Sequence, residues 1–124
     1  MQKQATTNDR QQKTPVKAAD LSPFMILGQL KAYVSMFVQQ RGFNNTSRDI
    51  VLLLVEEVGE LAKSIRKSIG LKIDQQKTEK YPAVEEEIAD VFFHLLGLCN
   101  VLDVDLFKAL KNKALKNETR FWRK

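Results

Sequence analysis

The chain has 124 residues, of which 44% are hydrophobic, enough for one globular domain with a buried core. It contains no run of the roughly 18 apolar residues that a membrane helix needs, and no apolar segment near the N-terminus that resembles a secretory signal. The single cysteine, Cys99, lies in an apolar run and is typical of a reduced, buried thiol. We therefore expect a cytoplasmic protein without a membrane segment.

The net charge of +5 is concentrated near the end of the chain. Residues 106–124 carry seven Lys or Arg against one Glu, which gives +6. Residues 1–105 carry thirteen basic against fourteen acidic side chains, which gives −1. This distribution argues against a uniformly basic surface that coats nucleic acid, and it indicates either a local anion site or a solvated helix end near the C-terminus.

Residues 1–20 are polar and have little to bury, so we expect a disordered or loosely attached tail before a domain that spans 21–124. Ser22 followed by Pro23 is a cap and first-turn signal for a helix. Apolar residues then recur at helical spacing until Gly42, where this first helix is predicted to end.

A second helix is predicted from Ser47 and Asp49 to about Gly70. A polar connection from Asp74 to Lys80 follows, and Pro82 suits the first turn of a third helix.

The third helix is apolar almost all round over residues 91–102, which predicts that it is the most buried of the helices. A fourth helix is predicted to begin at Asp103 or Val104. The expected fold class is therefore all-α, with four antiparallel helices in a bundle-like domain. A partner must cover a helix that is apolar all round, so we expect a dimer or a tetramer.

Five carboxylates lie on the predicted second and third helices. At about 100° per residue, Glu57 and Glu60 lie about 60° apart on one helix, and Glu56 lies on the same side. Glu87 and Asp90 have the same i,i+3 spacing on the next helix. The two pairs could face each other across a bundle.

Such a cluster repels itself unless protons or cations neutralise it. Its hard oxygen donors favour Mg²⁺, or Mn²⁺, over zinc. A solvated acidic face is the simpler alternative. A carboxylate-bridged di-iron site is disfavoured, because the one histidine, His94, follows Asp90 by four residues instead of following a Glu by three.

Two glycines, Gly59 and Gly97, lie inside these helices, where each is unfavourable by about 1 kcal/mol relative to alanine. Close approach of a ligand or backbone would explain them, and so would ordinary helix packing.

The acidic pattern resembles a known signature. Glu56-Glu57-x-x-Glu60, a spacer of 26 residues and Glu87-x-x-Asp90 are similar to the paired motifs of the MazG-like, all-α nucleoside triphosphate pyrophosphohydrolases. The resemblance extends over about residues 24–122. The C-terminal pattern also resembles the family's basic motif, in the form Lys113-x-x-Lys116-Asn117-Glu118-x-Arg120-x-Trp122.

The resemblance implies Mg²⁺-dependent hydrolysis of a nucleoside triphosphate between its α and β phosphates, giving the monophosphate and pyrophosphate. It also implies a role in clearing or limiting nucleotides, including damaged or non-canonical ones. It implies that Glu56 holds a further metal or orients the attacking water. The implied metal ligands are Glu57, Glu60, Glu87 and Asp90, and the implied phosphate-binding residues are Lys113, Asn117 and Arg120, from the same chain or from a second subunit.

His94 follows the metal stripe by one turn and could contact the base, although a lone histidine among apolar residues is more often part of a core. Trp122 could stack on a base or pack the terminal helix. Two other functions stay open: a phosphoribosyl-ATP pyrophosphohydrolase on the same scaffold, and a non-catalytic helical module whose basic helix binds an acidic partner or nucleic acid.

Overall fold

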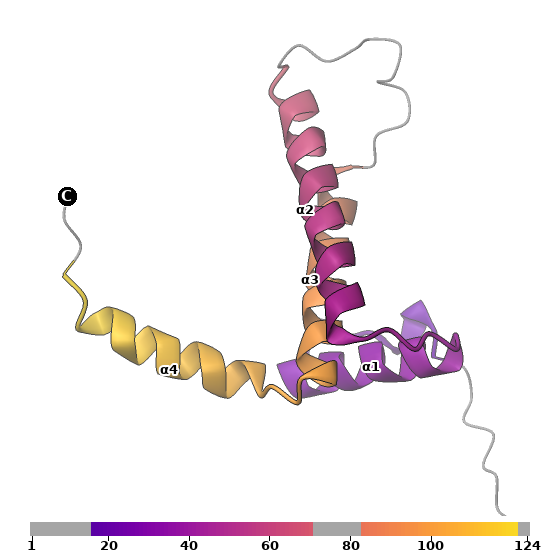
Figure 1. Cartoon of the computed structure of the whole chain (residues 1–124), viewed down its shortest axis with the longest axis horizontal. Helices are drawn as coiled ribbons and strands as arrows, with labels where there is room; N and C mark the ends of the chain where they lie inside the picture. The colour runs from indigo at the N-terminus through magenta and orange to yellow at the C-terminus, as the bar shows by residue number, and fades with distance from the viewer. Residues whose placement is uncertain (1–15, 71–82, 122–124) are drawn as a thin grey trace, which may run out of the picture.

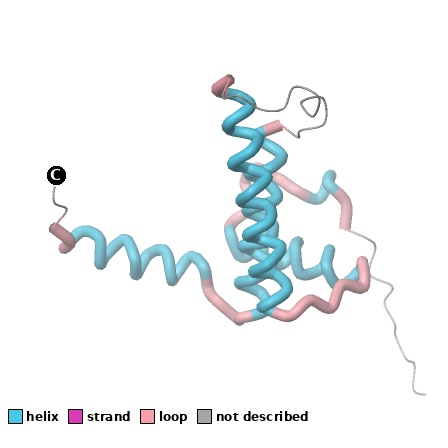
Figure 2. The backbone as a smooth tube through the Cα atoms, turned by 45° about the horizontal axis from the view of Figure 1, so that its top comes forward, coloured by secondary structure: helices cyan, strands magenta, loops and turns pink. Residues whose placement is uncertain are grey.

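The structure, a computed structural model, describes residues 16–70 and 83–121. Its elements are a short 3-10 helix, Ala18–Asp20, and four α-helices: α1 (Leu27–Gln40), α2 (Ser47–Ser68), α3 (Val84–Val101) and α4 (Leu106–Glu118). The described residues contain no β-strand, which confirms the all-helical prediction (Figure 2). None of these helices combines the length and the apolar character that crossing a bilayer requires.

Helices α2 and α3 run antiparallel and side by side, and α1 lies across their lower end, where it packs on α3 (Figure 1). Helix α4 leads away from this base and packs along none of the other three helices. The predicted bundle of four antiparallel helices therefore differs from the arrangement of the helices in the single chain. It forms an antiparallel pair, a crossing helix and a projecting helix.

Some predictions fall on residues that the structure does not describe. These are the tail up to residue 15, the polar connection with Pro82, and Trp122. Of the expected tail, the described end is a single 3-10 turn, Ala18–Asp20. Val16 joins it to α1, because its backbone N–H donates to Oε1 of Gln40 at 2.8 Å.

Helix α1 begins later than the Ser22-Pro23 signal predicts. The Ser22 side chain accepts a hydrogen bond from the backbone N–H of Phe24 at 3.2 Å, and its carbonyl accepts one from Met25 at 3.1 Å. These bonds close a separate turn. The helix starts after Ile26, whose extended backbone donates its N–H to Oε1 of Gln29 at 3.0 Å.

Helix α2 has the predicted start. Thr46 is the N-cap, and its hydroxyl accepts from the backbone N–H of Asp49 at 3.3 Å. The Asp49 carboxylate accepts in turn from the backbone N–H of Thr46 at 2.9 Å, which completes a capping box. The Thr46 backbone N–H and, at 2.8 Å, the Thr46 hydroxyl both donate to the Asp49 carboxylate, and they hold the pKa of Asp49 below its ordinary value.

A Schellman turn ends α3. Asp103 takes a left-handed conformation with φ 53°, and the backbone N–H of Val104 donates to the Cys99 carbonyl at 2.8 Å. The Lys31 ammonium donates to the Val104 carbonyl, so α1 ties down this turn. The Asp105 side chain then caps α4 by accepting from Lys108 at 3.0 Å, so α4 begins at Leu106 and not at Asp103 or Val104.

The buried apolar side chains gather where α1, α2 and α3 meet, and they are Val34, Ile50, Leu96 and Cys99. Helix α3 contributes more buried residues than any other described helix, in line with the prediction. One side of it nevertheless remains exposed, through Ile88, Phe92, Leu95 and Leu102.

Candidate active site

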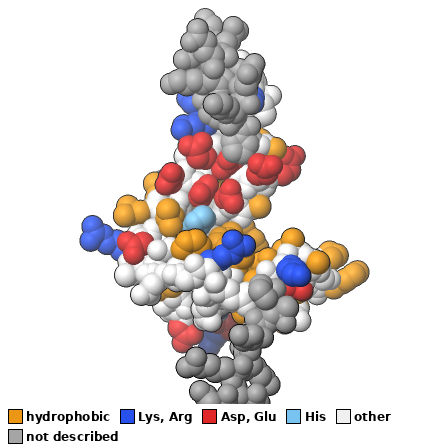
Figure 3. Space-filling view, turned by 90° about the vertical axis from the view of Figure 1, so that its right-hand side faces the viewer, with side chains coloured by type: hydrophobic (Ala, Val, Ile, Leu, Met, Phe, Trp, Pro, Cys, Tyr) orange, Lys and Arg blue, Asp and Glu red, His pale blue; other side chains and the backbone are white. Residues whose placement is uncertain are grey.

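Three carboxylates converge at the seam between α2 and α3, at the end away from the apolar core. One side-chain oxygen from each of Glu57, Glu87 and Asp90 lies within 4.8 Å of the other two. Glu57 faces α3 because it lies two helical turns from the buried Ile50, on the stripe by which α2 meets α3. Acidic side chains cover this part of the surface over both helices (Figure 3).

Glu87 is the least hydrated of the three. Its side chain is 2% exposed, and its Oε2 atom is buried without a hydrogen-bond partner. Burial raises the pKa of the Glu87 carboxyl, and the nearby charges of Glu57, Asp90 and Glu60 raise it further. A proton or a cation is needed to stabilise this group where it lies.

These residues fit a divalent cation. Oxygens around one octahedral Mg²⁺ lie about 3 to 4 Å apart, because each is about 2.1 Å from the ion. The three carboxylate oxygens, all within 4.8 Å of one another, would need only a small approach to reach that spacing. An ion held there would take the unpartnered Glu87 oxygen as a ligand atom, and this would account for a buried acceptor that otherwise has no partner.

Neither Glu60 nor Glu56 is a member of this cluster. The Glu60 carboxylate accepts from the Lys63 ammonium at 2.8 Å, in an i,i+3 ion pair on α2. It is near enough to Glu87 to raise the pKa of that carboxyl. Glu56 is exposed. Of the four residues predicted as metal ligands, the structure gathers Glu57, Glu87 and Asp90 and pairs Glu60 with a lysine.

His94 lies between the carboxylates and an apolar cleft. Its Nδ1 atom is 2.8 Å from the backbone carbonyl of Asp90. A carbonyl only accepts, so Nδ1 carries the hydrogen and the Nε2 atom of the neutral ring is left as an acceptor. Its ring also packs edge-on against Phe93, with 5.7 Å between centroids.

The cleft has a volume of about 420 Å³ and lies between α1, the start of α2 and α3. Figure 3 shows its setting: the acidic surface lies above, the single histidine borders it, and hydrophobic side chains lie below. Apolar walls and a few polar side chains line the cleft, a combination typical of small-molecule sites. The polar lining residues are Ser35, Gln39, Asn44, Asn45, His94 and Asn100.

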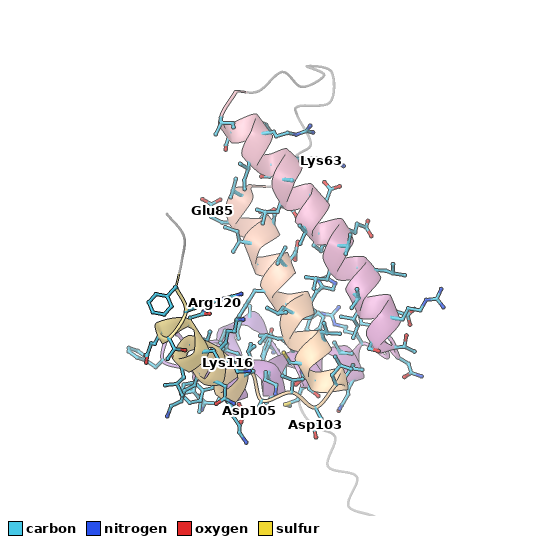
Figure 4. The ribbon with its side chains drawn as sticks, turned by 60° about the vertical axis from the view of Figure 1, so that its left-hand side comes forward. Lys63, Glu85, Asp103, Asp105, Lys116 and Arg120 are labelled. Carbon is cyan, nitrogen blue, oxygen red and sulfur yellow. The ribbon has the colours of Figure 1, made fainter. Side chains whose placement is uncertain are left out.

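The basic residues predicted to bind phosphate lie elsewhere in the single chain. Lys113, Asn117 and Arg120 follow one another at spacings of four and three along α4 and its end, so they share one side. Figure 4 shows Lys116 on α4 and Arg120 just beyond its end, both apart from Glu85 and Lys63 of the α2–α3 pair. The structure therefore does not bring the basic motif to the carboxylates of its own chain.

A match to a family model identifies the protein family of this chain. The model of the MazG nucleotide pyrophosphohydrolase domain matches residues 45–121, which include α2, α3 and α4. The chain belongs to this family. The recognition made from the two acidic motifs is thereby confirmed, and the activity class is that of a hydrolase acting on phosphoric anhydrides.

Relatives of this MazG domain agree with the match. The chain is 42% identical over 67 residues to YpjD of Bacillus subtilis, an uncharacterized protein, and the aligned part covers 54% of this chain and 60% of YpjD. The crystal structure of B. subtilis YpjD, provisionally classed as a pyrophosphatase, superposes with a TM-score of 0.68 at 29% identity, covering 81% of this chain and all of YpjD. The iMazG structure from Vibrio DAT 722 gives 0.56 at 28% identity, with 80% and 100% covered.

The cleft is the part of the MazG domain that the sequence patterns missed. Asn44 and Asn45 read as turn residues. Asn100 was detectable in principle, because Asp90, His94, Gly97 and Asn100 follow one another at spacings of four, three and three on one side of α3. No periodicity of the first helix could reveal that α1 crosses α3 and closes the cleft.

Proposed function

We propose that this MazG domain hydrolyses a nucleoside triphosphate between the α and β phosphates, with Mg²⁺ as its metal. The observation that carries the proposal is the convergence of Glu57, Glu87 and Asp90 around a buried, unpartnered carboxylate oxygen in a chain of this family. Glu60 completes the ligand set when its side chain leaves Lys63. Mn²⁺ could serve in place of Mg²⁺, since both accept oxygen ligands.

The residues have distinct tasks in this reaction. When bound, the cation neutralises the polyphosphate and lowers the pKa of a coordinated water. Glu56 lies one residue before Glu57 and is exposed, so it can accept a proton from the attacking water or orient it. Attack at the α phosphorus breaks its bond to the bridging oxygen and releases pyrophosphate and the monophosphate.

The cleft beside the carboxylates suits the nucleoside. Phe93 offers an aromatic wall, and the Nε2 atom of His94 offers an acceptor for a base N–H. The amide side chains of Asn44 and Asn45, which also line the cleft, can pair with either donors or acceptors. We also propose that the enzyme clears nucleotides, including those with non-canonical bases, and that it acts in the cytoplasm.

A homo-oligomer, dimer or tetramer, also belongs to the proposal. One side of the α2–α3 pair is apolar and uncovered in the single chain, and we call it the outer apolar face. Its residues recur at spacings of three, four or seven along each helix, the pattern by which helices pack against one another. They are Val51, Val55, Val58 and Ile65 of α2 and Ile88, Phe92 and Leu95 of α3, all exposed.

Pyrophosphate release from a panel of nucleoside triphosphates with Mg²⁺ tests the proposal. Phosphoribosyl-ATP belongs in the panel, because an enzyme for that substrate would share the acidic motif. We expect turnover of at least one triphosphate that depends on Mg²⁺ and is reduced at least a hundredfold in Glu60→Gln. Turnover of none of these compounds, or a wild-type rate in Glu60→Gln, would contradict the proposal.

A further inference from the structure

Helix α2 changes the sign of its charge along its length. Its middle is acidic, whereas residues 61–68 carry three cations and no acid. Arg66 and Lys67 lie in the last turn, where the helix dipole favours positive charge. Lys63 lies before that turn and one turn after Glu60. Its charge is therefore held against the acids of the candidate site and not at the end of the helix.

Glu56, Glu60 and Lys63 form one stripe on α2. They follow one another at spacings of four and three, so all three lie within about 60° of one another around the helix. Seven residues separate Glu56 from Lys63, which corresponds to about 10 Å along the helix axis. The residue proposed to act on the attacking water and this lysine therefore lie at opposite ends of the stripe, with Glu60 between them.

The ion pair between Lys63 and Glu60 is open to solvent. The Lys63 ammonium donates to Oε1 of Glu60 at 2.8 Å, and the two side chains are 47% and 35% exposed. Exposed pairs of this kind contribute little to stability, so each side chain can change its partner at low cost. Glu60 is also near enough to raise the pKa of the Glu87 carboxyl. The ammonium therefore lies one carboxylate away from the buried part of the site.

The cleft sets the direction in which a nucleoside triphosphate lies. Val34, Val38 and Phe93 form apolar walls of the cleft toward α1, and the acidic surface lies on its other side (Figure 3). A nucleoside in the cleft places the α phosphate at the carboxylates. The β and γ phosphates then extend toward the end of the α2–α3 pair away from α1, where Lys63 lies on α2 (Figure 4).

We infer that Lys63 binds the pyrophosphate half of the substrate, because its ammonium can exchange the Glu60 carboxylate for oxygens of the β and γ phosphates. The inference rests on the proposed pyrophosphohydrolase function and adds a protein contact to the leaving group. In an in-line displacement the attacking water and the leaving group lie on opposite sides of the phosphorus. Glu56 and Lys63, at the two ends of their stripe, match these two sides.

The role of Lys63 in the reaction is electrostatic. The water oxygen bonds to the α phosphorus and gives its proton to Glu56, and the bond from that phosphorus to the bridging oxygen breaks. The electron pair of this bond stays on the released pyrophosphate. An ammonium group beside those oxygens stabilises the charge that they gain, and Lys63 transfers no proton.

Binding of inorganic pyrophosphate to the full-length protein in Mg²⁺, measured by calorimetry, tests the contact. Lys63→Gln removes the charge, and we expect the dissociation constant for pyrophosphate to rise at least tenfold. Arg66→Gln is the matched control, because Arg66 is also an exposed cation of α2 but lies about 180° from Glu57 around the helix. We expect a change of less than twofold. No binding by the wild type, equal losses in both variants, or no loss in Lys63→Gln would overturn the inference.

Titration with Mg²⁺ alone separates a phosphate contact from a structural role. Lys63→Gln releases Glu60 from the ammonium, so this variant should bind Mg²⁺ at least as tightly as the wild type does. Weaker binding would mean that Lys63 orders the carboxylates, which overturns the inference. Lys63→Arg keeps a cation at this position and should keep the affinity for pyrophosphate within about threefold. A loss as large as that in Lys63→Gln would also count against the contact.

Turnover separates this inference from the proposed function. Lys63→Gln should lose at least tenfold in kcat/KM for the triphosphate and keep the wild-type affinity for the monophosphate product, which lacks the β and γ phosphates. An active wild type whose Lys63→Gln variant keeps both kcat/KM and pyrophosphate affinity overturns the inference and leaves the hydrolase intact. A wild type that hydrolyses no triphosphate contradicts the hydrolase, and the pyrophosphate titration still decides whether Lys63 binds this anion.

Discussion

Glu87 has the most unfavourable surroundings of any carboxylate in the described residues. It is nearly fully buried, one of its oxygens has no partner, and three other acids surround it. A buried unpaired charge destabilises a fold, unless a proton or a metal ion compensates it. The residue therefore links the stability of the metal-free protein to pH.

The direction in which stability changes with pH follows from the raised pKa of Glu87. An acid whose pKa is higher in the folded state stabilises the fold fully below its unfolded pKa, and this contribution is lost as the pH rises through the folded value. In EDTA, the melting temperature of the wild type should therefore fall, relative to that of Glu87→Gln, as the pH rises above about 4.5. Parallel melting curves for the two proteins between pH 4 and 8 would contradict this prediction.

Helical periodicity was sufficient to place Glu57 and Glu87 on facing stripes, because a helix fixes the direction of each side chain to within a narrow range. It could not predict which carboxylates meet. Glu60 lies three residues before Lys63, and the choice between an ion pair and a metal site depends on rotamers that no spacing encodes. The sequence therefore predicted the carboxylates of the site, but it could not predict which of them lie together.

At the scale of elements, the helices formed where caps and apolar periodicity indicated them. The Thr46–Asp49 capping box and the glycines at 42 and 70, with φ of 71° and 72°, bound the predicted helices closely. The predicted start of α1 was wrong, because Ser22 closes a local turn instead of capping the helix. The projection of α4 was not predictable. An apolar stripe indicates that one side of a helix packs against another surface, but it does not indicate whether that surface belongs to the same chain.

The two interior glycines make a matched pair. A Cβ atom added at Gly59 would have no neighbour within 4 Å, so the close approach considered for this glycine is absent from the described chain. Gly59→Ala should stabilise the protein by about 0.5 to 1 kcal/mol, through helix propensity alone. Thermal unfolding measures the gain, and a lower melting temperature would mean that another copy packs on this position.

Gly97→Ala has the same propensity gain but a different setting. Gly97 lines the cleft, and an added Cβ atom would lie 4.0 Å from Cγ1 of Val34, an ordinary contact. The fold should therefore tolerate the change, while the methyl group takes space from the ligand. We expect a KM for the triphosphate that rises severalfold at an almost unchanged kcat, and an unchanged KM would place the nucleoside elsewhere.

At the scale of the whole molecule, metal and fold should be thermodynamically linked. A cation that binds only the folded state at 100 times its dissociation constant stabilises that state by about 2.7 kcal/mol. Mg²⁺ should therefore raise the melting temperature at neutral pH, and EDTA should reverse the rise. Glu87→Gln should lose most of this response, whereas Glu85→Gln, an equal charge change at an exposed position in the same first turn of α3, should keep it. Equal responses from both variants would locate the ion outside the cluster.

The apolar core and the carboxylate cluster occupy opposite ends of the α2–α3 pair. The buried apolar side chains lie near α1, whereas Glu87 and Ser64, both polar, are the buried residues at the far end. Opening of the backbone should therefore be graded along the hairpin: amide hydrogens near Ile50 and Leu96 exchange with solvent only on global unfolding, and those near Glu60 and Glu87 exchange by local fraying. A metal ion bound by Glu57, Glu87 and Asp90 would hold α2 and α3 together at the end that frays. The same binding equilibrium would then set both the order of this end and the fraction of molecules ready for catalysis.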